Sequence, residues 1–178
     1  PMNSLNKILT ATALSGALLA VPAMAEEQGT LGATSTGKTD VSLTIADRVQ
    51  ITGMDNIPLG TYSGTGNLVY NEAYCVYRNG GGNYKVNVTT DDAEFKVVST
   101  IASDEVAFTV RVDGDNDASD GAAILHGADS GNMAGATTTN CGGGDNGAIE
   151  ITMTEADLQA AQTANDYTAT ITILVTPT

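Results

Sequence analysis

The chain has 178 residues, with 21 acidic side chains, 7 basic side chains and a formal net charge of −14 at pH 7. This excess of negative charge argues against nucleic acid and anionic lipid as partners, because both bind to basic surfaces. Only 16% of the residues are charged, and the abundance of Thr, Val, Ile and Gly is typical of a folded β domain rather than of a disordered chain.

The N-terminal 25 residues have the features of a secretory signal peptide. Residues 2–7 include one basic side chain, residues 8–21 are apolar, and residues 23–25 form an A-x-A cleavage motif. The apolar run is shorter than the roughly 20 residues of a membrane span. We therefore expect secretion, a mature chain that starts at Glu26 and is long enough for about one domain, and no membrane span after cleavage.

The next segment, residues 26–45, is expected to be an N-terminal extension. It begins polar and Gly-rich, and then Val41, Leu43 and Ile45 alternate with polar residues. That alternation predicts a strand with one apolar face. Such a strand must pair its backbone and bury its apolar face, either in its own domain or in another copy of the chain. Residues 46–48 interrupt the alternation.

The rest of the chain, residues 46–178, is predicted to be one all-β sandwich of seven or eight strands. A Gly/Asn-rich loop at residues 79–83 indicates a hairpin, and Thr154 begins a capping box for a short helix that ends near residue 163. The predicted strands are residues 49–51, 59–62, 73–78, 84–89, 95–98, 106–112, 148–153 and 167–176, with a short apolar piece at 123–125. In the last strand Ile171, Ile173 and Val175 share one face and threonines occupy the other.

Two cysteines, Cys75 and Cys141, are present. In a secreted protein this predicts a disulfide, which would contribute about 4 kcal/mol in the chain-entropy model. A metal pair is disfavoured, because His126 is the only histidine and there is no C-x-x-C motif.

No arrangement of residues indicates catalysis, and neither an enzyme nor a cofactor is expected. His126 lies in a Gly-rich loop, and the chain has no G-x-S-x-G motif. Asp113, Asp115 and Asp117 begin like a calcium loop, but Ala118 and Ile124 stand where that loop needs glycine and glutamate. A solvated turn is therefore predicted there. The six tyrosines are expected to be half-buried strand residues rather than a sugar platform.

Four stretches resemble the pilins of the chaperone–usher pathway, most closely the archaic type with the spore-coat-U-like fold. Residues 36–45 resemble the N-terminal donor strand, and residues 59–62 resemble the L/F-G-T-Y element. Residues 103–112 resemble a mid-domain strand, and residues 166–175 resemble the closing strand. One departure is that the family usually has a cysteine just after the donor strand, where this chain has residues 46–48 without one.

The resemblance implies an immunoglobulin-like sandwich that lacks its last strand and is completed by a neighbouring subunit. Val41, Leu43 and Ile45 would be the donor residues, and Ile171, Ile173 and Val175 would line the acceptor groove. A periplasmic chaperone and an outer-membrane usher would be the partners during assembly. The product would be a head-to-tail homopolymer, a cell-surface pilus (fimbrium) that supports adhesion and biofilm formation, with this chain as its major subunit.

Two alternatives remain open at this point. The chain could be a self-contained secreted sandwich that binds carbohydrate through its tyrosine-rich hairpin and loops. It could also be a calcium-dependent matrix protein that uses the loop at Asp113. In the first case residues 41–45 would pair within their own domain.

Overall fold

The computed structural model describes residues 27–178, so the predicted signal peptide at residues 1–25 lies outside the described residues. The chain divides into two units, Pro1–Ile45 and Ala46–Thr178. The second unit contains all the named strands. No helix among residues 27–178 is both long enough and apolar enough to cross a membrane.

The regular structure of the unit Ala46–Thr178 is almost entirely β-strand, with one short α-helix and two 3-10 turns. In chain order the elements are β1 (Val49–Thr52), β2 (Leu68–Arg78), η1 (Asn79–Gly81), β3 (Asn83–Thr90), β4 (Lys96–Ser99), β5 (Asp104–Ala107), β6 (Thr109–Asp113), β7 (Ala122–Ile124), β8 (Met133–Ala134), η2 (Cys141–Gly143), β9 (Gly147–Met153), α1 (Glu155–Ala160) and β10 (Ile171–Pro177).

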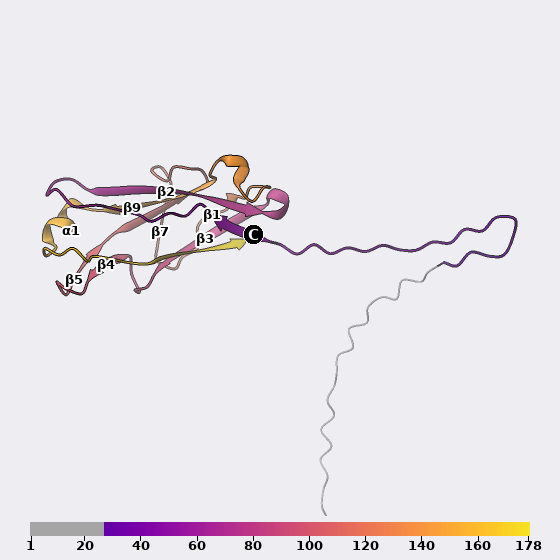
Figure 1. The fold of residues 1–178 in the computed structure, drawn as a ribbon, viewed down its shortest axis with the longest axis horizontal. Coiled ribbons are helices and arrows are strands. Elements are labelled where there is room, and N and C mark those ends of the chain that lie inside the picture. The colour runs from indigo at the N-terminus through magenta and orange to yellow at the C-terminus, as the bar shows by residue number, and fades with distance from the viewer. Residues whose placement is uncertain (1–26) are drawn as a thin grey trace, which may run out of the picture. The chain divides into compact units, whose positions relative to one another are not determined.

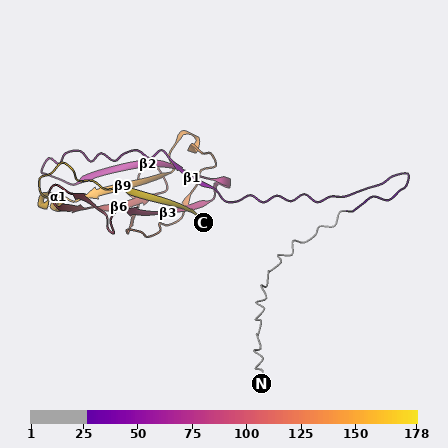
Figure 2. The same ribbon diagram turned by 60° about the horizontal axis from the view of Figure 1, so that its bottom comes forward.

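The strands form two facing layers (Figures 1 and 2). One sheet has the order β1-β2-β9-β6-β7, a second has the order β10-β3-β8, and β4 and β5 form a two-stranded ribbon. The pairings within the sheets are antiparallel. The sheets do not close on one another, so β1, β7, β10 and β8 are edge strands. The prediction of an all-β, immunoglobulin-like sandwich is confirmed.

Alternating apolar side chains from both sheets fill the core between the layers. Val86 and Val88 of β3 are fully buried, as is Ile149 of β9, and each neighbouring residue points to the other face of its sheet. The core comprises Tyr74, Val76, Tyr84, Val86, Val88, Val106, Phe108, Val110, Val112, Ile124, Ile149, Ile151 and Met153. The predicted hairpin joins β2 to β3, and the loop at its tip includes η1.

Several element boundaries differ from the prediction. β2 begins at Leu68, five residues before the predicted strand. The buried Glu72 is charged, so it interrupts the alternation of apolar and polar residues in the sequence. Its carboxylate accepts a hydrogen bond of 2.8 Å from the Asp55 amide. The predicted strand 106–112 is divided at Phe108. The part before this residue pairs with β4 and the part after it pairs with β9, so the chain changes partner there.

Other predictions for short segments were wrong. Residues 59–62 form no strand, and β10 begins at Ile171 rather than at residue 167. The helix α1 has the predicted N-cap, where the Thr154 side chain accepts from the Asp157 amide, but it ends at Ala160. The two-residue strand β8 was not predicted, because it lies within a long Gly-rich loop and is defined only by its pairing with β3.

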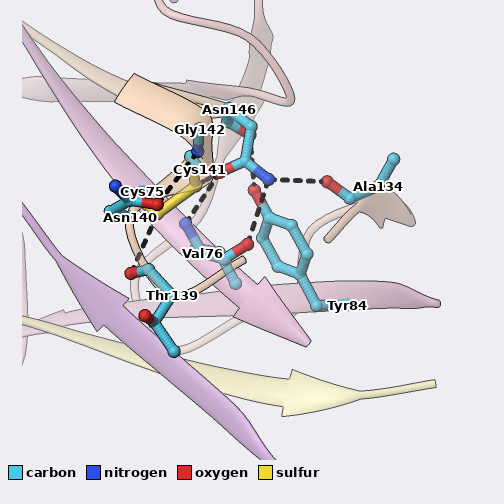
Figure 3. Close-up of a disulfide and its surroundings, with 9 residues drawn as sticks. All are labelled: Cys75, Val76, Tyr84, Ala134, Thr139, Asn140, Cys141, Gly142 and Asn146. Atoms are coloured by element: carbon cyan, nitrogen blue, oxygen red, sulfur yellow. Dashed lines mark hydrogen bonds between the residues drawn. A yellow bond between two sulfur atoms is a disulfide. The ribbon is translucent and has the colours of Figure 1, made fainter. Parts of the chain in front are cut away.

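A disulfide joins Cys75 in β2 to Cys141 in η2, across 66 residues of sequence. Asn146 lies beside it (Figure 3). The Asn146 side chain accepts from the Val76 amide at 2.7 Å and donates to the carbonyl oxygens of Val76 and Ala134 at 3.0 and 2.9 Å. Asn146 therefore satisfies the Val76 amide, and it shares the Val76 carbonyl with the Ala136 amide, which donates to that carbonyl at 2.9 Å.

Removing the disulfide should lower the free energy of unfolding by about 4 kcal/mol, because a 66-residue loop in the unfolded chain is then unconstrained. The Cys75→Ala/Cys141→Ala double variant and the reduced wild type should give the same value in urea unfolding. A loss below about 1 kcal/mol would contradict this estimate of the constraint.

The two fully buried core tyrosines should respond oppositely to removal of the hydroxyl group. Tyr84 donates to the Asn146 carbonyl at 2.9 Å, and burial, aided by the charge of Asp113, raises its pKa to about 12, so the donor proton stays in place. The Tyr74 hydroxyl is buried without a partner. Tyr84→Phe should cost about 0.5–1.5 kcal/mol, whereas Tyr74→Phe should leave stability unchanged or raise it. Urea unfolding of the oxidised variants measures both, and a larger loss for Tyr74→Phe would refute the assignment.

Candidate functional site

The candidate site is formed by two edge strands, β1 of the larger sheet and β10 of the smaller one. Each pairs on one side only, β1 with β2 and β10 with β3. β1 lies beside the C-terminal end of β10, the yellow arrow in Figure 1, and at their closest the Cα atoms of the two strands are within 8 Å. No ladder joins them.

The unpaired backbone groups of β10 belong to Ile171, Ile173 and Val175. The Asp91 amide donates to Thr170 at 3.2 Å and the Thr178 amide donates to Asn83 at 3.1 Å, so even-numbered residues bond toward β3. Because bonding directions alternate along an antiparallel strand, the three odd-numbered residues direct their N–H and C=O groups away from β3, toward the open edge.

The side chains of these same three residues point toward the core. Ile171, Ile173 and Val175 pack against the core cluster but are only half-buried. Val86 and Val88, on the adjacent strand of the same sheet, are fully buried. The apolar face of β10 therefore lacks cover on its edge side. The sequence prediction placed these three residues on one face, and they do share it.

The opposite edge has a similar arrangement that the sequence prediction missed. The Asn79 amide donates to the Arg48 carbonyl at 3.1 Å, so the alternate residues Val49 and Ile51 direct their backbone groups away from β2. Both are half-buried. The strand has only four residues, which is too few for alternation alone to reveal a site.

A pocket of about 480 Å³ lies beside the segment that leads into β10. The irregular segment after β1 contributes Leu59 and Tyr62 to its wall, and the buried Tyr62 hydroxyl has no hydrogen-bond partner. The other lining residues are Gly60, Thr61, Leu68, Val97, Val106, Met153, Leu158, Ala161, Gln162, Thr163, Ala164, Asn165 and Tyr167. Most of them are apolar or small.

Carboxylates fix the entry to β10. Asp166 accepts from the Ser99 hydroxyl, and from the amides of Thr100 and Ile101 at 3.0 and 3.1 Å. These bonds, above all the one from Ser99, hold the pKa of Asp166 below its usual range. Asp104 accepts from the Tyr167 hydroxyl at 2.7 Å, and this bond raises the pKa of Tyr167 to about 12. The approach to β10 is thus held by these polar groups and by an antiparallel bridge to β4, in which Val98 and Thr168 exchange backbone hydrogen bonds of 3.0 and 3.1 Å.

In the N-terminal unit the predicted donor residues are exposed. Val41, Leu43 and Ile45 have relative exposures of 93%, 81% and 74%. Residues 39–45 form no strand, and the regular structure described in this unit is a bridge between Glu27 and Lys38. The predicted strand at residues 41–45 is not formed, because no neighbouring strand pairs its backbone.

Within residues 27–178 the acidic residues of the calcium alternative are not gathered into a metal site, and two tyrosines of the hairpin are buried. Within residues 27–178 no group of three or more His, Cys, Asp or Glu side chains could hold a metal ion. Asp115 and Asp117 instead accept from backbone amides two residues ahead, at 2.8 and 2.9 Å. Tyr74 and Tyr84 of the hairpin are fully buried, so neither presents a ring to a sugar.

No protein-family model matches the chain, and no curated protein matches it. Among solved structures, the chain is similar to one in the crystal structure of the CsuC–CsuE chaperone–tip adhesion subunit pre-assembly complex from archaic chaperone–usher Csu pili of Acinetobacter baumannii. The sequence identity is 14% and the TM-score is 0.42. The match covers 89% of this chain and 52% of the other, so this chain spans about half the length of the chain that it matches.

Asp166→Asn should make the stability of the fold depend less on pH in the acid range. Because the pKa of Asp166 is lower in the folded chain than the value of about 3.9 in an unfolded one, its bonds stabilise the fold above pH 4 and are lost as the pH falls through the folded pKa. Melting temperatures are measured between pH 2 and pH 7. The wild type should melt at a higher temperature than the variant at pH 7, and the difference should vanish toward pH 2. Asp120→Asn, in an exposed loop, is the control and should keep the wild-type slope.

Proposed function

We propose that the chain is a structural subunit of a cell-surface pilus of the chaperone–usher type, assembled by strand donation between copies. The domain at 46–178 would accept a strand and the extension at 26–45 would supply one. The observation that supports this most directly is that Ile171, Ile173 and Val175 combine unpaired backbone groups with half-covered apolar side chains. An added strand would satisfy both deficiencies at once.

The extension has the complementary chemistry. Val41, Leu43 and Ile45 are spaced by two residues, as are Ile171, Ile173 and Val175, so both segments present three apolar side chains along a strand. Burial of the three donor side chains would stabilise the joint by roughly 1.5–3 kcal/mol each, and each ladder hydrogen bond would add about 0.5–1.5 kcal/mol. A contact between an extension and another copy's domain is head-to-tail and does not close, so it extends into a filament.

Strand insertion requires the groove to open at one end. A strand between β1 and β10 needs about two strand spacings, close to 10 Å, whereas the Cα atoms of these strands lie within 8 Å at their closest. The four-residue β1 would have to shift outward there. A partner that holds the edge open and covers it before assembly, as a periplasmic chaperone does, would fit this need. We further propose export through the periplasm and an outer-membrane usher, with a role in adhesion and biofilm formation.

The proposal is tested by placing one charge on either face of the extension. Leu43→Asp should abolish polymers, because it would bury an unpaired carboxylate in the neighbouring copy. Ser42→Asp adds the same charge on the opposite face and should leave assembly intact. The readout is the polymer ladder of surface protein in gels run without heating, together with electron microscopy of filaments.

A chain without residues 26–45 cannot supply a strand to another copy, so it shows the result expected when strand donation is fully lost. It should fold and stay monomeric. Polymers from this deletion, or equal assembly of the Leu43→Asp and Ser42→Asp variants, would contradict the proposed function.

A further inference from the structure

The three residues that join the extension to β1 are held against the tip of the β2–β3 hairpin. The Asn79 side chain accepts from the Arg48 amide at 2.7 Å and donates to the Ala46 carbonyl at 3.0 Å. The Asn79 amide also donates to the Arg48 carbonyl at 3.1 Å. One asparagine therefore bonds the backbone of residues 46–48 at three points.

The neighbouring Arg78 links this junction to the end of β10. Its guanidinium pairs with Asp47 at 3.3 Å and donates to the Thr178 carbonyl at 2.6 Å and to the Asn83 carbonyl. Asp47 is 63% exposed, so the ion pair itself contributes little. We call residues 46–48 with Arg78 and Asn79 the junction clamp. Its strength lies mainly in the bonds from Asn79.

The clamp opposes one particular alternative conformation. β1 and β10 run antiparallel to each other, because β1 pairs with β2, β2 leads through the hairpin into β3, and β3 pairs with β10. For residues 41–45 to enter the groove of their own domain, the chain would reverse at residues 46–48 and form a hairpin with β1. Such a strand would have to lie parallel to β10, and parallel pairing is slightly the weaker kind.

The junction sequence also lacks the residues of a tight turn. A three-residue hairpin loop needs a residue with positive φ at its last position, which is usually glycine. Ala46, Asp47 and Arg48 include no glycine. Apart from glycines, positive φ is found in the described chain only at Ser103 and Cys141. The reversal would therefore break the bonds to Asn79 and strain residue 48.

We propose that the junction clamp directs the extension to another copy of the chain by preventing it from folding back into its own groove. This inference rests on the proposed function and assigns Asn79 as a positioning residue that decides between a closed monomer and a polymer. A strand from another copy has no short link to β1, so it is free to lie antiparallel to β10.

The test compares refolding of the exported wild type, residues 26–178, with refolding of three variants of it. Asn79→Ala removes the two side-chain bonds, and Arg48→Gly permits the turn while keeping the backbone groups that Asn79 contacts. Asn83→Ala, at an exposed position of the same hairpin, is the matched control. Each oxidised protein is diluted from guanidinium, and the ratio of monomer to polymer is measured by chromatography with light scattering. Binding of a synthetic peptide of residues 36–45 to the monomer fraction is measured by fluorescence anisotropy.

Asn79→Ala should raise the ratio of monomer to polymer roughly tenfold, as expected for two lost hydrogen bonds, and those monomers should no longer bind the peptide. Arg48→Gly should likewise raise the ratio of monomer to polymer and reduce peptide binding by the monomers. If Asn79→Ala does not fold, the result for Arg48→Gly tests the inference. Asn83→Ala should match the wild type. Lower stability of Asn79→Ala with an unchanged ratio and unchanged peptide binding would mean that Asn79 is only structural, and would overturn the inference.

A failure of the proposed function would look different. In that case the wild type itself would neither polymerise nor bind the peptide. If the wild type does both and the two junction variants behave like it, the proposed function stands and the inference about the clamp is wrong.

Discussion

The backbone of β10 has hydrogen-bonding capacity that its own chain leaves unused on one side. Backbone N–H and C=O groups are costly to bury without partners, and β10 pairs only with β3. The residues with the unpaired backbone groups also point half-covered apolar side chains toward the core. Any partner for this edge has to provide a backbone ladder and apolar side chains together, which is the chemistry of another strand.

The rest of the sandwich holds that edge in place at both ends. β3, next to β10, has fully buried Val86 and Val88, and the disulfide and Asn146 fix the hairpin end of the larger sheet. At the other end, Asp166 and Asp104 hold the segment that leads into β10. The edge is therefore held in place on one side and left open on the other, as the proposed role in assembly requires.

In the proposed assembly, the junction between the extension and β1 would add a second constraint, on which copy receives the extension. A flexible junction would let a strand find the nearest open groove, which is its own. The bonds from Asn79 to residues 46–48 oppose this. A protein that donates a strand to its neighbour needs both an attractive groove elsewhere and a barrier against closure at home, because specificity is a difference between two free energies.

Alternation in the sequence determined much of this molecule. It predicted the all-β sandwich, the inward faces of β3 and of residues 106–112, the hairpin and the shared face of Ile171, Ile173 and Val175, because side chains on a strand must alternate between faces. What the sequence could not decide was which strands are edges, that β1 opposes β10, and that Asn79 bonds residues 46–48. These depend on contacts between residues far apart in the chain, and only the tertiary structure brings such residues together.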